Sequence, residues 1–203
     1  MQLHLIRHPR PAVEPGICYG QTDIGLAECP AAVAERLRPL LPESFALHAS
    51  PLARARLLAE ALGTPRLDAR LKEIDFGDWE GRSFTAIGSA IDDWAADPLG
   101  FRAPGGESPN EMAARVLQWL GETTGNGGQT PISAEMGEIG VCPPFPPFPD
   151  ALVVVAHGGP LRAIAGHLLG MPPERWIGLD FGCGQVTRLD VEDWGVVLKW
   201  FNR

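Results

Sequence analysis

Residues 151–160 read ALVVVAHGGP and decide the fold of the chain. The first six are apolar without interruption, which is typical of a strand covered on both faces in a parallel sheet. Gly158, Gly159 and Pro160 end that strand and open a helical pattern. His157 lies between the two elements, and ligands of open α/β sheets bind where strand carboxyl ends meet helix starts.

The rest of the chain repeats this alternation of strand and helix patterns. Further strands are predicted at short apolar runs and at a C-terminal hairpin: 2–7, 45–49, and 183–191 with 195–201. Helices are predicted where apolar residues recur every three or four positions: 30–41, 52–62, 83–97, 108–120 and the segment from 158 to the stop at Gly170. Strands that alternate with helices predict an α/β fold with a mostly parallel sheet.

Residues 121–150 break the pattern, because six glycines and six prolines fall within them. Such a composition cannot propagate a helix or a strand ladder, so a loop or an extended excursion is predicted. A surface insertion, a lid and a polyproline docking segment are all compatible with it. We expect one domain over residues 1–203 that carries this Gly/Pro-rich insertion.

The composition is that of an ordinary globular protein, with 45% hydrophobic and 21% charged residues. The net charge of −8 argues against broad binding to nucleic acid or anionic membranes. No apolar run approaches the roughly 20 residues that span a bilayer, and the early strand pattern leaves no room for a signal peptide. Four scattered cysteines without a CxxC pair predict free thiols, no metal and a cytoplasmic protein. A homodimer is compatible with the sequence, which does not decide the oligomeric state.

Two histidines define a candidate catalytic pair. His8 ends the predicted strand 2–7, as His157 ends the strand 151–156, so a parallel sheet should bring both to one edge. Arginines near such a pair disfavour the imidazolium form, which keeps the rings neutral and nucleophilic near neutral pH. A neutral imidazole can attack phosphorus and form a phosphohistidine.

Two arginines are placed to bind a phosphate beside these histidines. Ser50 and Pro51 read as the N-cap and the first residue of the helix over 52–62, which puts Arg54 in its first turn. Helix starts favour anions, and Arg7 next to His8 adds a second guanidinium that can grip two phosphate oxygens. The same turn design at Gly158 offers further backbone N–H groups.

A phosphoryl transfer of this kind also needs an acid to protonate the departing alkoxide. Glu73, in the stretch LKEIDFG, is the best-placed candidate; Glu80 is the substitute and Asp75 comes third. Structural roles are assigned to His4, His48 and His167. Three arginines are surface residues by default, with contact to the leaving group as the alternative: Arg82, Arg102 and Arg162.

The chain resembles the phosphoglycerate-mutase-like branch of the histidine phosphatase superfamily. The resemblance rests on stretches in the family's order that cover nearly the whole chain except 121–150: Arg7-His8, SPLARA at 50–55, Glu73 with FGDWEG at 76–81, PGGES at 104–108 and His157-Gly158-Gly159. The stretch GICYGQTD at 16–23 is more particularly similar to the α-ribazole phosphatases of cobalamin synthesis.

The resemblance implies a three-layer α/β/α sandwich and an enzyme without metal or other cofactor. It implies that His8 is the phosphorylated nucleophile and Glu73 the proton donor. A phosphate pocket of Arg7, Arg54 and His157, together with the Gly158 backbone, is implied as well. By the same analogy, Gly20 and Gln21 border the substrate.

Two positions depart from the family pattern. Pro9-Arg10 stands where Gly-Glu is usual, and a proline removes one backbone N–H. If that N–H normally faces phosphate, its loss costs about 1–3 kcal/mol, or up to roughly a hundredfold in rate. Glu14 stands near a position where relatives carry a phosphate-binding asparagine, and its carboxylate would repel phosphate unless Arg10 neutralises it.

We expect a phosphomonoesterase that acts through a phosphohistidine, with a small-molecule phosphate monoester, preferably α-ribazole 5′-phosphate, as substrate. One alternative is a broad-specificity sugar-phosphate phosphatase or a mutase of the phosphoglycerate type. The other is a phosphate-ligand-binding protein whose turnover Pro9 and Glu14 have weakened. Fold similarity alone does not name the leaving group.

Overall fold

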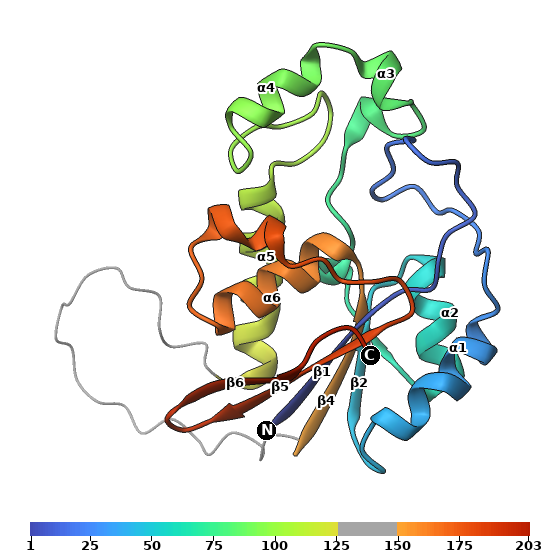
Figure 1. Cartoon of the computed structure of the whole chain (residues 1–203), viewed down its shortest axis with the longest axis vertical. Helices are drawn as coiled ribbons and strands as arrows, with labels where there is room; N and C mark the ends of the chain where they lie inside the picture. Colours follow the sequence, from blue (N-terminus) through green and yellow to red (C-terminus); the bar gives the residue numbers. More distant parts are fainter. Residues whose placement is uncertain (126–149) are drawn as a thin grey trace, which may run out of the picture.

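The computed structural model describes residues 1–125 and 150–203. Within them, six strands form one sheet in the order β3-β2-β4-β1-β5-β6 (Figure 1). The strands are β1 Gln2–Arg7, β2 Ala46–Ala49, β3 Arg66–Leu67, β4 Ala151–Ala156, β5 Val186–Glu192 and β6 Gly195–Trp200. The predicted strands at 2–7, 45–49 and 151–156 and the C-terminal hairpin are therefore confirmed.

The central strand β1 pairs on one side with β4 in parallel and on the other side with β5 in antiparallel fashion. β2 is parallel to both β3 and β4, so the half of the sheet from β3 to β1 is wholly parallel. The antiparallel hairpin β5–β6 closes the opposite edge. The prediction of a mostly parallel sheet is confirmed.

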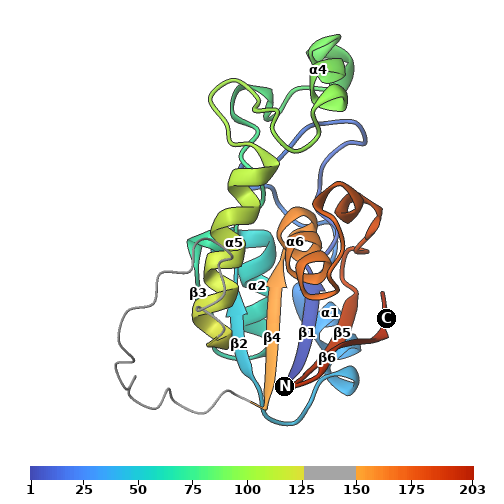
Figure 2. The ribbon, with the colours of Figure 1, turned by 90° about the vertical axis from the view of Figure 1, so that its left-hand side faces the viewer.

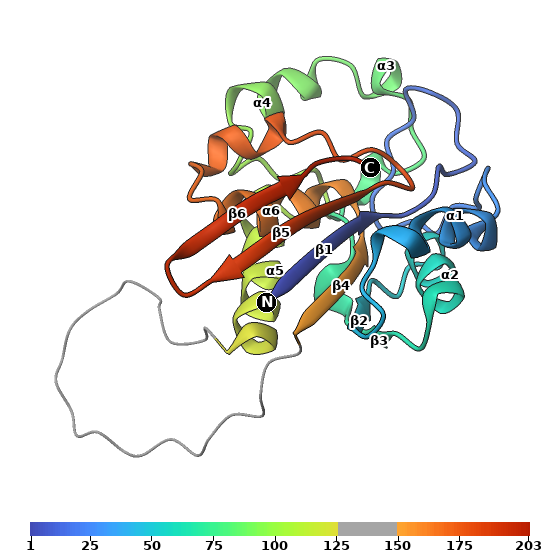
Figure 3. The same cartoon turned by 60° about the horizontal axis from the view of Figure 1, so that its bottom comes forward.

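Helices cover both faces of the sheet (Figures 2 and 3). α1 Pro30–Leu37 and α2 Ala53–Leu62 pack on one face, and α5 Pro109–Thr124 and α6 Gly158–Leu168 pack on the other. Each face has its own apolar core, and alternate residues of β4 enter one or the other: Leu152 and Val154 face α5 and α6, whereas Val153 and Val155 face α1 and α2. The three-layer sandwich implied by the family resemblance is confirmed.

Three predicted helices have different boundaries in the structure. The segment 83–97 forms two short helices, α3 Phe84–Ile87 and α4 Ala90–Ala96, because Gly88 adopts φ = 69° between them. The segment 30–41 is helical only to Leu37 and continues as the 3-10 turn η1 Arg38–Leu40, which contains a proline. No described helix is long and apolar enough to cross a bilayer.

The third difference concerns the start of the predicted insertion. α5 begins at a capping box between Ser108 and Glu111 and runs to Thr124, so residues 121–124 are helical. Gly125 then ends the helix in the left-handed conformation, with φ = 67°. The remainder of the predicted insertion, together with Cys142, lies outside the described residues, and Cys18, Cys29 and Cys183 are free.

Three 3-10 turns complete the described elements: η2 Ala69–Leu71, η3 Gly77–Trp79 and η4 Pro173–Gly178. η2 and η3 flank residues 72–76, which belong to no helix or strand. This irregular segment contains Glu73 and passes the carboxyl edge of the sheet.

Candidate active site

Three strand ends bring the candidate site together. His8 follows β1, His157 follows β4 and Ser50 follows β2, all at the carboxyl edge of the parallel half of the sheet. The ring centroids of His8 and His157 lie 5.1 Å apart, and the two side chains are 1% and 0% exposed. The two histidines, 149 positions apart in sequence, therefore form one buried pair.

The contacts of His8 fix its tautomer. Nδ1 lies 2.7 Å from the carbonyl oxygen of Pro9, which can only accept, so Nδ1 holds the proton and Nε2 keeps its lone pair. Burial, followed by the charges of Arg54 and Arg7, lowers the pKa of His8 to about 3 even though the Pro9 hydrogen bond opposes the shift. His8 is thus a neutral imidazole at neutral pH.

His157 is oriented by Ser50. The hydroxyl Oγ of Ser50 lies 2.7 Å from Nε2 of His157 and accepts a hydrogen bond of 3.3 Å from the Leu52 N–H. We assign the Ser50 hydroxyl as donor to Nε2, which leaves the proton of a neutral ring on Nδ1. Burial and then the neighbouring His8, Arg54 and Arg7 hold the pKa of His157 well below its usual value.

The prediction of Ser50 and Pro51 as helix cap and first turn is wrong. α2 begins at Ala53, and its N-cap residue is Leu52, whose side chain makes no capping hydrogen bond. The hydroxyl of Ser50 instead contacts His157, while the side chain of Asp23 accepts the hydrogen bond of the Ala53 N–H at 2.7 Å. The helix start is therefore capped from a distant loop.

Arg54 lies in the first turn of α2, as predicted, and its side chain is fully buried. Its guanidinium donates to the carbonyl oxygens of Gly20 and Thr22 and lies 5.5 Å from the ring centroid of Tyr19. Arg7, the other cation, donates from Nη1 to the Phe181 carbonyl at 2.6 Å. The charges of both guanidinium groups lower the pKa values of both histidines.

Three buried donors of this cluster lack a hydrogen-bond partner among the described residues. They are Nε of Arg7, Nε of Arg54 and Nδ1 of His157. Unpaired buried donors are costly, and all three belong to side chains that cluster with His8. Guanidinium and imidazole N–H groups are donors that suit an anion such as phosphate.

Gly158, the first residue of α6, lies next to Arg7 and Arg162. A Cβ built on Gly158 would lie 3.7 Å from Cζ of Arg7 and 3.7 Å from Nη1 of Arg162. Two guanidinium groups therefore flank the start of the helix, where backbone N–H groups also favour an anion.

Glu73 is held at the same helix start. Its carboxylate oxygens accept hydrogen bonds from the Gly159 N–H at 3.2 and 3.3 Å, and Oε1 also accepts one from the Ile74 N–H at 3.0 Å. The carboxylate of the predicted acid thus binds the residue that follows Gly158, and Gly158 itself lies next to Arg7 and Arg162.

The two alternative acids have other tasks. Glu80 accepts hydrogen bonds from the backbone N–H groups of Gln21, Thr22 and Phe76 and from the Thr22 hydroxyl. Burial raises the pKa of Glu80, but these hydrogen bonds outweigh it and hold the pKa below its usual value. Asp75 accepts from the Gly77 N–H at 2.9 Å and shapes a turn.

Gly20 and Gln21 are fixed to the site through their backbones. The Gly20 carbonyl accepts from Arg54, and the Gln21 N–H donates to Glu80. A Cβ on Gly20 would overlap the carbonyl oxygen of Ile74, so only glycine allows this loop to approach so closely.

Of the two departures from the family pattern, Pro9 contacts His8 and Glu14 is exposed. The Pro9 carbonyl orients His8, a role that needs no N–H group. Glu14 is exposed, and no ion pair joins it to Arg10 in the described part of the chain.

Sequence reasoning assigned a surface role to Arg162 and did not consider Arg115 or Glu107. Arg162 is one-quarter exposed and donates from Nε to the Leu179 carbonyl at 2.8 Å. Arg115 and Glu107 bind each other, and Arg115 also binds the backbone carbonyl of Glu73. Glu107 belongs to the PGGES stretch of the family resemblance, whereas no local signal marks Arg115, whose carbonyl partners are more than 40 positions away. Among residues 1–125 and 150–203, no group of three or more His, Cys, Asp or Glu side chains is arranged to hold a metal ion.

Known proteins resemble this chain in both sequence and fold. The putative phosphoserine phosphatase 2 of Hydrogenobacter thermophilus is 27% identical over 214 residues, covering 100% of this chain and 95% of that protein. The glucosyl-3-phosphoglycerate phosphatase of Mycobacterium tuberculosis is 30% identical over 192 residues, covering 86% of this chain and 78% of that protein.

Solved structures include the α-ribazole phosphatase of Shigella flexneri, with a TM-score of 0.81, 23% identity and coverage of 100% of this chain and 96% of that one. The mycobacterial glucosyl-3-phosphoglycerate phosphatase has a TM-score of 0.77, 26% identity and coverage of 99% and 98%. The family model described as "Histidine phosphatase superfamily (branch 1)" matches residues 3–133 and 148–203. With that match over most of its length, and with relatives named as phosphatases, the chain belongs to branch 1 of the histidine phosphatase superfamily and is a phosphatase.

Proposed function

We propose that the chain is a metal-independent phosphomonoesterase and that its intermediate is a phosphohistidine on Nε2 of His8. The lone pair of Nε2 attacks phosphorus, the bond from phosphorus to the ester oxygen breaks, and the carboxyl group of Glu73 protonates the departing alkoxide. Arg7, Arg54 and His157 stabilise the charge of the transferring phosphoryl group.

The second half of the cycle returns the enzyme to its starting state. The Glu73 carboxylate takes a proton from water as the water oxygen attacks phosphorus. The phosphorus–nitrogen bond breaks, its electron pair returns to Nε2 of His8, and inorganic phosphate leaves. Splitting hydrolysis into two displacements lowers the barrier of each.

One observation carries the proposal: a neutral buried imidazole with a free Nε2 lies among three unpaired buried donors. Guanidinium groups supply the positive charge that a phosphoryl transfer needs. The depressed pKa of His8 keeps the nucleophile deprotonated although it is surrounded by cations.

We propose α-ribazole 5′-phosphate as the preferred substrate. Its support is the stretch at 16–23, which resembles α-ribazole phosphatases, and the position of Tyr19 within it. The Arg54 guanidinium lies over the Tyr19 ring, so an aromatic ring lies close to the phosphate site and can contact a planar base there.

A second candidate is a phosphate ester that carries a carboxylate near the phosphate. Arg162 favours it, because its guanidinium lies beside Arg7 and its nearest ion-pair partner, Asp180, is 3.9 Å away and 89% exposed. The named sequence relatives point the same way, since phosphoserine and glucosyl-3-phosphoglycerate both bear a carboxylate.

A panel of phosphate esters tests the proposal. The parent and His8→Ala are assayed in chelator with p-nitrophenyl phosphate, α-ribazole 5′-phosphate, phosphoserine and 3-phosphoglycerate, and kcat/KM is compared. We expect turnover by the parent only, and an alkali-stable, acid-labile phosphoenzyme after rapid quenching. An activity that chelator abolishes, or a His8→Ala variant that retains turnover, would refute the mechanism.

The same panel separates the alternatives. Transfer of phosphate between phosphoglycerates with little release indicates a mutase. Tight binding of an ester without release indicates a protein whose turnover has been lost. A highest kcat/KM for phosphoserine or 3-phosphoglycerate, lost in Arg162→Gln, favours the carboxylate-bearing class over α-ribazole 5′-phosphate.

A further inference from the structure

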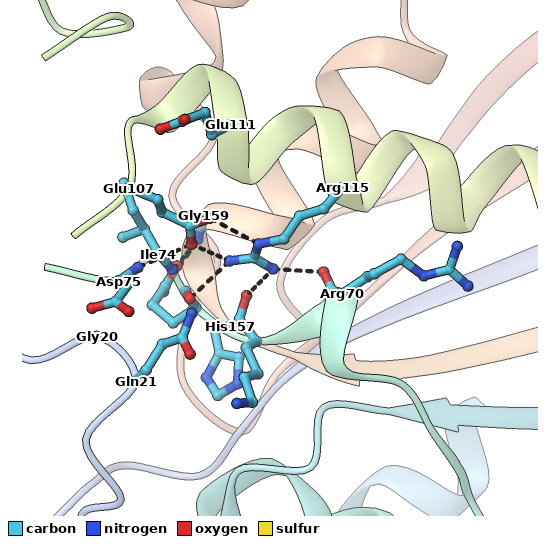
Figure 4. A network of polar contacts seen from close by, with 12 residues as sticks. Gly20, Gln21, Arg70, Ile74, Asp75, Glu107, Glu111, Arg115, His157 and Gly159 are labelled. Carbon is cyan, nitrogen blue, oxygen red and sulfur yellow. Dashed lines mark hydrogen bonds and ion pairs between the residues drawn. The ribbon is translucent and has the colours of Figure 1, made fainter. Parts of the chain in front are cut away.

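Arg115, on α5, binds the backbone of the segment that contains Glu73 (Figure 4). Its guanidinium donates to the carbonyl oxygens of Arg70 at 2.6 Å, Lys72 at 2.8 Å and Glu73 at 2.9 Å. One side chain thus satisfies three backbone acceptors, one in η2 and two in the irregular segment that follows it.

Glu107 completes the clamp on the other side of Glu73. Its carboxylate accepts hydrogen bonds from Nε and Nη2 of Arg115 and from the Asp75 N–H at 3.0 Å. The Glu107 N–H donates to the Asp75 carbonyl at 2.9 Å. Backbone groups before, at and after Glu73 are therefore tied to one ion pair.

The clamp is more than a surface ion pair. The side chains of Arg115 and Glu107 are 20% and 19% exposed, and the pair is bidentate. A planar guanidinium presents several donors in fixed directions, which a lysine cannot reproduce. Loss of either partner frees the 72–76 segment without removing any group that faces the phosphate.

We propose that Arg115 and Glu107 are positioning residues that fix the carboxyl group of Glu73 for proton transfer to the leaving group. This inference rests on the proposed role of Glu73. A carboxylate on a segment without regular structure needs such support, because proton transfer requires approach to within hydrogen-bond distance. The Gly159 N–H holds the carboxylate end, and the clamp holds the backbone end.

The dependence on the leaving group tests this role. p-Nitrophenolate departs without a proton, whereas the alkoxide of β-glycerophosphate needs one. kcat/KM reports the first phosphoryl transfer even when later steps limit kcat, so it is the quantity to compare. In Arg115→Lys we expect kcat/KM for β-glycerophosphate to fall about tenfold more than for p-nitrophenyl phosphate, a fraction of what general acids contribute.

Glu73→Gln should show the same selective loss, and the double variant should be no worse than Glu73→Gln alone on β-glycerophosphate. Arg56→Lys is the matched control, since Arg56 forms an exposed ion pair with Glu60 on α2. Equal losses on both substrates, or additive losses in the double variant, would overturn the positioning role. If Arg115→Lys does not fold, Glu107→Gln is judged by the same criteria.

Failure of the inference and failure of the proposed function give different results. Without any leaving-group selectivity in Glu73→Gln, the acid assignment itself fails. With selectivity in Glu73→Gln and none in the clamp variants, only the positioning role fails.

Discussion

Buried neutral histidines should make the free energy of unfolding fall steeply with acid. Burial is the largest cause of the shifts that lower the pKa of His8 to about 3 and that of His4 to about 4, and both side chains are 1% exposed. In the unfolded chain both titrate near 6.5. The unfolded state therefore binds more protons below that pH, and the stability present above it is lost as the pH falls.

The magnitude follows from the width of the window. Between pH 7.5 and 4.5 each of these histidines should cost about 2.6 kcal/mol of stability, and the two together about 5 kcal/mol. His157 and His48 are shifted in the same direction and add to this loss. Because a domain of ordinary stability has about 5–15 kcal/mol in total, much of it should be gone by pH 4.5.

Urea unfolding followed by tryptophan fluorescence measures this loss in phosphate-free buffers at pH 7.5, 6.5, 5.5 and 4.5, since bound phosphate would itself stabilise the fold. His8→Asn should flatten the dependence below pH 6 by about 1.4 kcal/mol per pH unit. His167→Asn, at an exposed position in α6, is the matched control and should keep the parent slope. An unchanged stability between pH 7.5 and 4.5, or equal slopes in parent and His8→Asn, would refute the reasoning.

Three substitutions near the site have further expected outcomes. Ser50→Ala removes the hydroxyl bound to His157 and should lower the free energy of unfolding by about 1–3 kcal/mol, measured in urea, together with a lower kcat. Gly20→Ala should destabilise the fold by about 3 kcal/mol, the upper end of what overpacking costs, because its Cβ overlaps a backbone carbonyl. Gly25→Ala, with no atom near its Cβ, should be almost neutral, and similar melting temperatures of the two variants would contradict this. Arg54→Lys cannot hold both carbonyl oxygens of the 20–22 loop and a phosphate, so the inhibition constant of inorganic phosphate should rise about tenfold, and an unchanged constant would contradict the role.

The parts of the fold that short-range patterns determine were predictable from the sequence. Strands β1, β2 and β4 stand out as apolar runs, and the hairpin around Asp193 and Gly195 follows from its turn residues. The sequence predicts one helix over 83–97, because nothing in its pattern shows that Gly88 adopts a positive φ. In the structure that conformation ends α3.

Contacts between distant segments explain what the sequence concealed at the site. Ser50 precedes a proline and resembles a cap, and only the position of His157 on the adjacent strand end assigns its hydroxyl elsewhere. Arg115 is the seventh residue of the 16-residue helix α5 and one of the polar residues of that helix. Its acceptors are backbone carbonyl oxygens, which any sequence provides. The meeting of His8 and His157 was expected, because a parallel sheet brings the carboxyl ends of its strands to one edge.

The pairing of β1 bears on how the protein is made. This strand lies between β4 and β5, so its backbone partners are synthesised long after it. Until then His8 has no neighbouring strand, and the nascent chain must keep an apolar segment from aggregating. Appearance of phosphatase activity during synthesis should therefore report completion of the sheet centre, and release of a chain stopped before Val186 should leave an inactive product.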